Sequence, residues 1–145
     1  MSNISLNAAQ KIVNGIVKAA SNRKLGPVAV ALVDGRGSLK AFAAQDGAAL
    51  SRADFALTKA LSVISMGMGS RSLEKRAREK PDFARAVSAV TGKAFMAMRG
   101  GVIVRNGNGD VVGAVGVSGD SSANDELVAV EGIDDAGFAA DPGAE

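Results

Sequence analysis

The apolar residues near the N-terminus recur at the spacing of an amphipathic helix. Ser5 stands directly before this series, where its side-chain oxygen can accept a bond from a free backbone N–H. The intervening polar residues, such as Lys11 and Lys18, fall on the opposite side. We therefore expect a helix whose apolar face consists of Leu6, Ala9, Val13, Ile16, Val17 and Ala20 and which ends before "SNRKLGP".

A strand hairpin is predicted over residues 27–44. The segment "PVAVALVD" is apolar throughout and rich in Val, as is typical of a strand covered on both faces. "DGRG" then has the residue types of a tight turn, and "SLKAFAA" alternates apolar and polar positions. Asp34 and Asp46, each followed by glycine, are common turn starters.

The middle of the chain is predicted to be helical. Ser51 and Asp54 have the spacing of a capping box, and apolar positions continue from there through Ile64. After a break at "GMGS", the charged segment 71–90 predicts one or two short helices, with Pro81 at a start.

A second pair of strands and a last helix follow. "KAFMAMR" and "GVIVR" are interpreted as one strand bent at Gly100–Gly101, because glycine permits a bulge. "NGNG" predicts a turn into the partner strand "DVVGAVGVSG". Ser122 and Asp125 repeat the capping-box spacing, which predicts a helix through Ile133. The element order indicates an α+β domain with an antiparallel sheet, spanning residues 1–136, with residues 137–145 as a loose tail.

Charge and composition exclude several kinds of function. The net charge of +2 is too small to indicate a nucleic-acid partner, and no aromatic residue accompanies the basic positions at 71–80. No apolar run is long enough for a membrane span or a signal sequence, so we expect a cytoplasmic protein. The chain has neither His nor Cys, which removes thiol nucleophiles, the commonest general base and the commonest metal ligands.

Several motifs resemble the GlcG/HbpS-like family, also called the haem-degrading-domain family. They are "LVDGRGSLKAFA" with Asp46-Gly47-Ala48, Lys59-Ala60 in the next helix, and "GGV" at 100–102 followed by "VVGAVGVSG" and Asp125-Glu126. The resemblance spans roughly residues 5–133. It implies a profilin-like or roadblock-like fold of three layers, in which helices flank a central antiparallel sheet of about five strands. It also implies a homo-oligomer, and haem binding in some members.

Haem-binding members use a side chain such as His, Cys or Thr near the iron, and the first two are absent here. Four methionines, Met66, Met68, Met96 and Met98, offer a thioether, which suits haem iron mainly beside a His and more often fills a core. Our expectation from the sequence is therefore that the protein has no cofactor.

Candidate site residues come from the same motifs. Lys59 lies in an apolar helical segment, where burial would lower its pKa and make it a usable base; a solvated Lys, or one paired with Asp34 or Asp46, is the alternative. Arg99 and the N–H groups of Gly100 and Gly101 would stabilise a developing oxyanion, unless the glycines only form a bulge.

The segment "VSGDSSAND" leads from a strand to a helix start, where Ser118 and Gly119 would bind a ligand carboxylate, unless Asp120 and Asp125 already occupy that field. Asp125 is also a candidate for proton transfer. The acidic residues of this last helix diverge too widely to chelate a metal together, so no metal site is expected.

These residues leave three hypotheses for the function. The first is a homo-oligomeric protein that binds a small, anionic, partly apolar metabolite of a catabolic pathway. The second is a cofactor-free isomerase, tautomerase or lyase in which Lys59 or Asp125 moves a proton while Arg99 and the glycines hold an enolate. The third is a haem-binding or haem-degrading protein, which only the resemblance implies.

Overall fold

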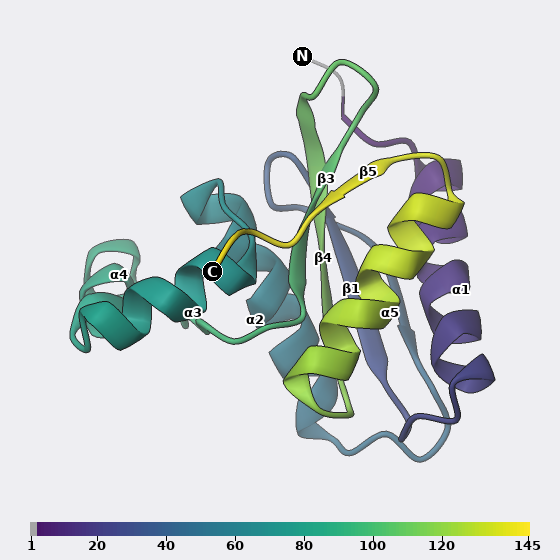
Figure 1. Ribbon diagram of the computed structural model, residues 1–145, viewed down its shortest axis with the longest axis horizontal. Helices are drawn as coiled ribbons and strands as arrows, with labels where there is room; N and C mark the ends of the chain where they lie inside the picture. Colours follow the sequence, from purple (N-terminus) through teal and green to yellow (C-terminus); the bar gives the residue numbers. More distant parts are fainter. Residues whose placement is uncertain (1–2) are drawn as a thin grey trace.

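The computed structural model describes residues 3–145 as a five-stranded antiparallel sheet with five helices around it (Figure 1). The strands lie in the order β2-β1-β4-β3-β5. The elements along the chain are α1 (Leu6–Asn22), β1 (Ala29–Asp34), β2 (Leu39–Ala44), α2 (Ser51–Met66), α3 (Ser70–Glu79), α4 (Phe83–Thr91), β3 (Gly101–Arg105), β4 (Val111–Ser118), α5 (Ser122–Asp135) and β5 (Ala139–Asp141). This is the predicted α+β fold with its three layers.

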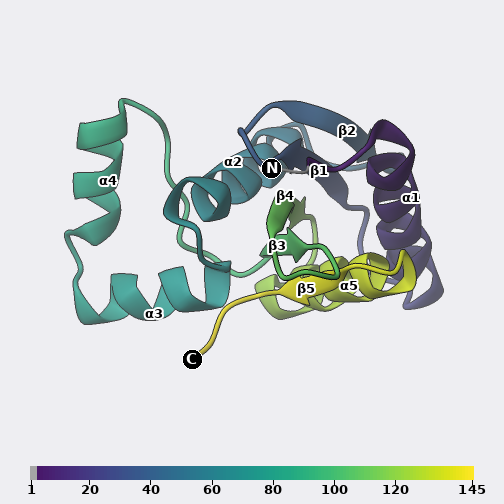
Figure 2. The same ribbon diagram turned by 90° about the horizontal axis from the view of Figure 1, so that it is seen from above.

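Helices cover both faces of the sheet. Helices α1 and α5 lie together against one face and α2 lies against the other (Figure 2). Strand β1 is buried along its whole length because Val30 and Leu32 face α1 and α5, whereas Ala31 and Val33 face α2. The apolar run at 27–34 is thus a strand covered on both faces, as expected. Helices α3 and α4 extend away from the sheet beyond α2 (Figure 2).

One glycine of β4 sets how closely α2 approaches the sheet. A Cβ built on Gly116 would collide with the carbonyl oxygen of Ala56 and lie 2.8 Å from the amide nitrogen of Ala60. Both neighbours are backbone atoms of α2, so they cannot move aside as a flexible side chain could. The missing side chain therefore allows direct backbone contact between helix and strand, which places the next turn of α2, with Lys59, against the end of β4.

The helix starts differ from the predicted capping boxes. Helix α2 begins at Ser51 itself, with Leu50 at the N-cap position and no side-chain cap. Helix α5 is capped by Ser121, whose hydroxyl accepts a bond from Asn124 N–H, so the cap lies one residue before the predicted Ser122. Only the Ser5 cap of α1 is confirmed.

Two predicted segments also differ. Residues 93–99 are not a strand; strand β3 begins only at Gly101, because the preceding chain crosses to α2, where Met96 N–H donates to Ser62 Oγ. The predicted loose tail at 137–145 contains β5, which pairs with β3 at Ile103, Val104 and Arg105. An ion pair between Arg105 and Asp141 accompanies that pairing. Within residues 3–145, no helix has both the length and the apolar character needed to cross a membrane.

Candidate functional site

A buried pair of opposite charges joins α2 to α5 beneath the end of β4. Lys59 Nζ donates to the Val117 carbonyl oxygen at 2.9 Å and to Asp125 Oδ2 at 3.4 Å. The side chains are only 3% and 2% exposed. The partner of Lys59 is therefore Asp125, and neither Asp34 nor Asp46.

Burial dominates the ionisation of this pair. Desolvation lowers the pKa of Lys59 and raises the pKa of Asp125, and their mutual attraction only partly opposes both changes. Each shift favours the neutral form, so the two pKa values move toward each other. A proton shared between an amine and a carboxyl group of closer pKa is easier to move than one in an exposed ion pair.

The start of α5 is occupied by carboxylates of the chain itself. Asp125 Oδ1 accepts a bond from Asp120 N–H at 2.9 Å, and the N–H of Gly119 also favours its ionised form. Asp120 in turn accepts bonds from Asn124 Nδ2 and Gly26 N–H, and these bonds lower its pKa. The N–H groups that the sequence offered to a ligand carboxylate therefore bind Asp125.

The hydroxyl of Ser118 lies beside this pair and accepts a hydrogen bond from Arg52, which was not among the predicted site residues. Arg52 Nη1 donates to Ser118 Oγ at 3.3 Å, and within residues 3–145 Arg52 forms no ion pair. Its guanidinium also lies 6.0 Å from the ring centre of Phe55. Arg52 is the second residue of α2, and its sequence neighbours give no signal for this contact.

The two glycines at the predicted bend have different roles. Gly100 has φ of 117°, and a Cβ there would lie 2.6 Å from the Val117 oxygen and 2.9 Å from Lys59 Nζ. This position therefore favours glycine and leaves room for the lysine. The N–H of Gly101 donates to Ser70 Oγ at 3.0 Å, so it is already bonded and does not face a ligand.

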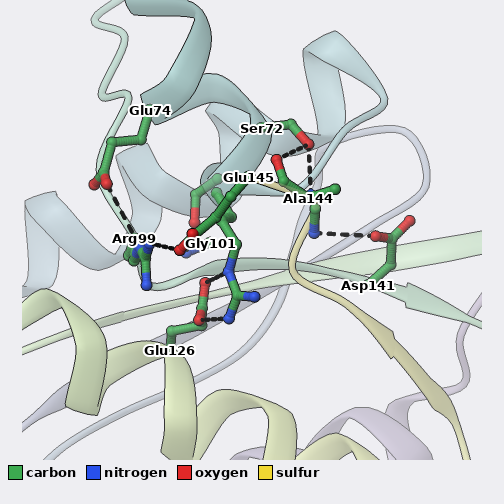
Figure 3. A network of polar contacts seen from close by, with 11 residues as sticks. Ser72, Glu74, Arg99, Gly101, Glu126, Asp141, Ala144 and Glu145 are labelled. Atoms are coloured by element: carbon green, nitrogen blue, oxygen red, sulfur yellow. Dashed lines mark hydrogen bonds and ion pairs between the residues drawn. The ribbon is translucent and has the colours of Figure 1, made fainter. Parts of the chain in front are cut away.

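Arg99 belongs to a separate network between α3, α5 and the C-terminal segment (Figure 3). Its guanidinium pairs with Glu74 at 3.4 Å and with Glu145. Beside it, Arg71 pairs with the buried carboxylate of Glu126. The pairing with Arg99 lowers the pKa of Glu145. Arg99 is thus neutralised by two carboxylates and does not join the Lys59–Asp125 pair.

The structure therefore brings together five of the seven predicted residues. Lys59, Asp125, Ser118 and Gly100 meet at the end of β4, and the N–H of Gly119 also reaches Asp125. Gly101 faces Ser70 instead, and Arg99 pairs with Glu74 and Glu145. The reasoning from sequence missed Arg52, Ser70, Arg71 and Glu126; only Glu126, next to Asp125 in a family motif, carried a signal.

Two cavities lie near α2 and α3, away from the buried pair. One, of about 260 Å³, is lined by Met68, Ser72, Lys75, Arg76, Glu79, Ala144 and Glu145. The other, of about 320 Å³, lies between α2, α4 and the turn from β1 to β2. Neither the Lys59 amine nor the Asp125 carboxylate lines one of them.

Comparison with known proteins decides the family. The model of a family described as "haem degrading protein HbpS-like" matches residues 4–134, which is nearly the whole chain. The chain belongs to the HbpS-like family. This confirms the resemblance read from the motifs. A search among curated proteins found no match.

Solved structures of this fold are similar over almost their entire length. The structure of HbpS is 28% identical, with a TM-score of 0.79, and the match covers 91% of this chain and 89% of that one. A Klebsiella pneumoniae protein, ORFY, is 27% identical, with a TM-score of 0.82 and coverage of 92% and 90%. PduOC in complex with haem is 21% identical, with a TM-score of 0.82 and coverage of 94% and 96%; it shows the shared fold.

The expectation that the protein has no cofactor is wrong. The family to which the chain belongs is described by haem, and one structural neighbour was solved as a haem complex. The prediction was based on the lack of His and Cys. That lack excludes the usual iron ligands, but it does not exclude contacts with the haem macrocycle or with its propionates.

The cavity at α3 offers some of the groups that haem requires. A thioether from Met68 lines it together with the cations Lys75 and Arg76 and the carboxylates Glu79 and Glu145, and thioether sulfur is a known haem-iron ligand. Cationic side chains suit the two propionates. Because the chain has no His, Cys or Tyr, a thioether is the remaining side-chain type among the common haem-iron ligands, and Met68 supplies one in this cavity.

Proposed function

We propose that this protein binds a small, partly apolar anion, and that haem is the first ligand to test. Membership of the HbpS-like family supports this, as does the similarity to HbpS over nine-tenths of the chain. Haem is itself a partly apolar anion, so the proposal includes both the metabolite-binding and the haem-binding hypotheses.

The observation that carries the proposal is the shared lining of the cavity at α3. Met68 would face the iron, whereas Lys75 and Arg76 would hold the propionates. Neither cation forms an ion pair within residues 3–145, although Arg76 lies over the ring of Phe83 at 5.6 Å. A bound haem would supply redox and oxygen chemistry, which the side chains of this protein do not offer.

A hemin titration followed by visible absorption tests this proposal. We expect a saturable shift of the Soret band. Met68→Leu should change the band position, since it removes the sulfur but keeps the volume, whereas Met98→Leu at an exposed position should not. Lys75→Gln/Arg76→Gln should weaken binding about tenfold, as expected for the loss of charge-assisted hydrogen bonds.

The matched control for charge is Lys80→Gln/Arg85→Gln, which removes the same charge outside the cavity. An absent Soret shift would exclude haem as the ligand. Equal spectra and affinities for the wild type, Met68→Leu and Lys75→Gln/Arg76→Gln would show that haem binds elsewhere.

A second candidate function is proton transfer on a small carbonyl or carboxylate metabolite, as in an isomerase, tautomerase or lyase. The opposite pKa shifts of Lys59 and Asp125, which share a hydrogen bond, favour it. The two side chains are 3% and 2% exposed, so in this function the site would have to open for the substrate to reach them. The pair would then take a proton from a carbon next to a carbonyl and return a proton to another atom of the substrate. Arg52 and Ser118 would hold the substrate carboxylate. With a candidate metabolite, Lys59→Met should abolish turnover, whereas a protein that only binds should lose affinity alone.

We also propose that copies of the chain assemble into a homo-oligomer. Large apolar side chains lie exposed on several elements, with Leu50 at 96%, Val90 at 88% and Leu39 at 53% exposure. Burial of such side chains between copies would remove apolar surface from water.

A further inference from the structure

The cavity of about 320 Å³ between α2 and α4 has a chemistry of its own. Its walls are mainly apolar, with Leu61 and Ile64 from α2, Val87 from α4, and Phe95 from the segment after α4. Its volume falls within the range of sites that bind small organic ligands.

Two cations complete the lining. Arg36 comes from the turn between β1 and β2, and Lys93 comes from the segment after α4. No carboxylate lines the cavity, and within residues 3–145 neither cation forms an ion pair. The nearby carboxylate of Asp34 accepts the backbone N–H groups of Arg36 and Ser38. The cavity therefore combines an apolar body with two cations that form no ion pair among the described residues.

The polar groups in the wall are already bonded to the protein. Ser62 Oγ donates to the Thr58 carbonyl oxygen and accepts from Met96 N–H, and Ser65 Oγ donates to the Ser62 carbonyl oxygen. These hydroxyls hold the wall together, which leaves Arg36 and Lys93 as the groups that can recognise a ligand's charge.

The wall is firm on the side of α2 and adjustable on the side of α4. Helix α2 is fixed by the sheet. Helix α4, in contrast, has no fully buried residue, and its first residue, Phe83, packs edge-to-face on Phe95 with ring centres 5.7 Å apart. A helix held by so few buried contacts can shift to admit a ligand at low cost in free energy.

We propose that this cavity binds a small amphiphilic carboxylate, whose aromatic or aliphatic body lies between Leu61, Val87 and Phe95 and whose carboxylate meets Arg36 and Lys93. This site is separate from the cavity at α3 and from the Lys59–Asp125 pair. It does not rest on haem binding, and either proposal can fail while the other holds.

The test is a ¹H–¹⁵N NMR titration of the full chain with 3-phenylpropionate. We expect saturable shifts at millimolar concentrations in the amides of residues 35–37, 61–65 and 91–95. The neutral amide of the same compound should bind at least about tenfold more weakly, because it cannot form the charge-assisted bonds. Arg36→Gln/Lys93→Gln should lose about tenfold in affinity for the carboxylate and little for the amide.

The control Lys80→Gln/Arg85→Gln removes the same charge outside the cavity and should bind like the wild type. Val87→Phe, which fills the cavity from the adjustable helix, should abolish binding while it leaves the melting temperature near that of the wild type. Shifts centred on other residues, no saturation, or equal affinities for the wild type and Arg36→Gln/Lys93→Gln would each overturn the proposal. Shifts centred on the cavity at α3 would assign the carboxylate to the haem-type site instead.

Discussion

The substitution Lys59→Met isolates the energetics of the buried pair. It keeps most of the side-chain volume but removes the cation that lies 3.4 Å from Asp125 Oδ2. Asp125 is then left as a buried carboxylate held by the N–H groups at the start of α5, chiefly that of Asp120. Loss of one partner from a buried ion pair costs about 3–5 kcal/mol of unfolding free energy. We expect a cost in this range at pH 8.

The cost should depend on pH in a defined direction. Without Lys59, the folded-state pKa of Asp125 rises further above its unfolded value of about 4. Between these two values the folded variant binds one proton more than the unfolded chain. Its stability therefore falls as pH rises, by up to about 1.4 kcal/mol per pH unit. The difference in stability between wild type and Lys59→Met should thus be small near pH 5 and grow toward pH 8.

Urea unfolding followed by circular dichroism at several pH values measures this difference. Lys59→Met/Asp125→Asn should lose the added pH dependence and cost less than the sum of the single substitutions, because neither charge is left alone. Lys11→Met, at an exposed site on α1, should stay within about 0.5 kcal/mol of the wild type. A difference below about 1 kcal/mol at pH 8, or one that does not change with pH, would refute the reasoning.

Three further predictions concern packing, a loop contact and assembly. Gly116→Ala should destabilise the fold by about 3 kcal/mol or more, because the new Cβ collides with the Ala56 carbonyl oxygen; in thermal unfolding, Gly107→Ala, where nothing lies within 4 Å, should cost far less. Asp120→Asn should lower the free energy of unfolding by about 1 kcal/mol at pH 7, because the Asp120 carboxylate accepts a hydrogen bond from Gly26 N–H. The wild type has this stability above about pH 4 and loses it as pH falls through the lowered pKa of Asp120. Equal urea midpoints of the two proteins at pH 7 would contradict this. Light scattering after gel filtration should give a multiple of 14.5 kDa, and a clean monomer would exclude the homo-oligomer.

The order of the elements follows from the sequence because local patterns carry it. The apolar period of residues 6–20 requires a helix with one buried face, and the continuous apolar run at 27–34 requires a strand covered twice. Both elements can be predicted because their apolar patterns involve only residues that are close together in the sequence. The same is true of the glycine-rich stretch at 100–119, whose turn and strand spacing predicted β3 and β4.

The errors within elements lie where two local choices are close in free energy. Ser121 and Ser122 are equally good caps by residue type, and in the folded protein Ser121 is the cap. Residues 139–141 have no strand signal of their own, and they form β5 because the edge of β3 supplies hydrogen-bond partners.

The candidate site divides in the same way. Its apolar neighbours in the sequence made burial of Lys59 one of two alternatives, and the fold both buries it and pairs it with Asp125, 66 positions later. Arg99 looked available in the sequence, but the fold places Glu74 and Glu145 on it, the latter 46 positions away. Burial of one face is encoded by local periodicity, whereas the partner of a charge depends on which distant segments the packed helices and strands bring within a few ångströms.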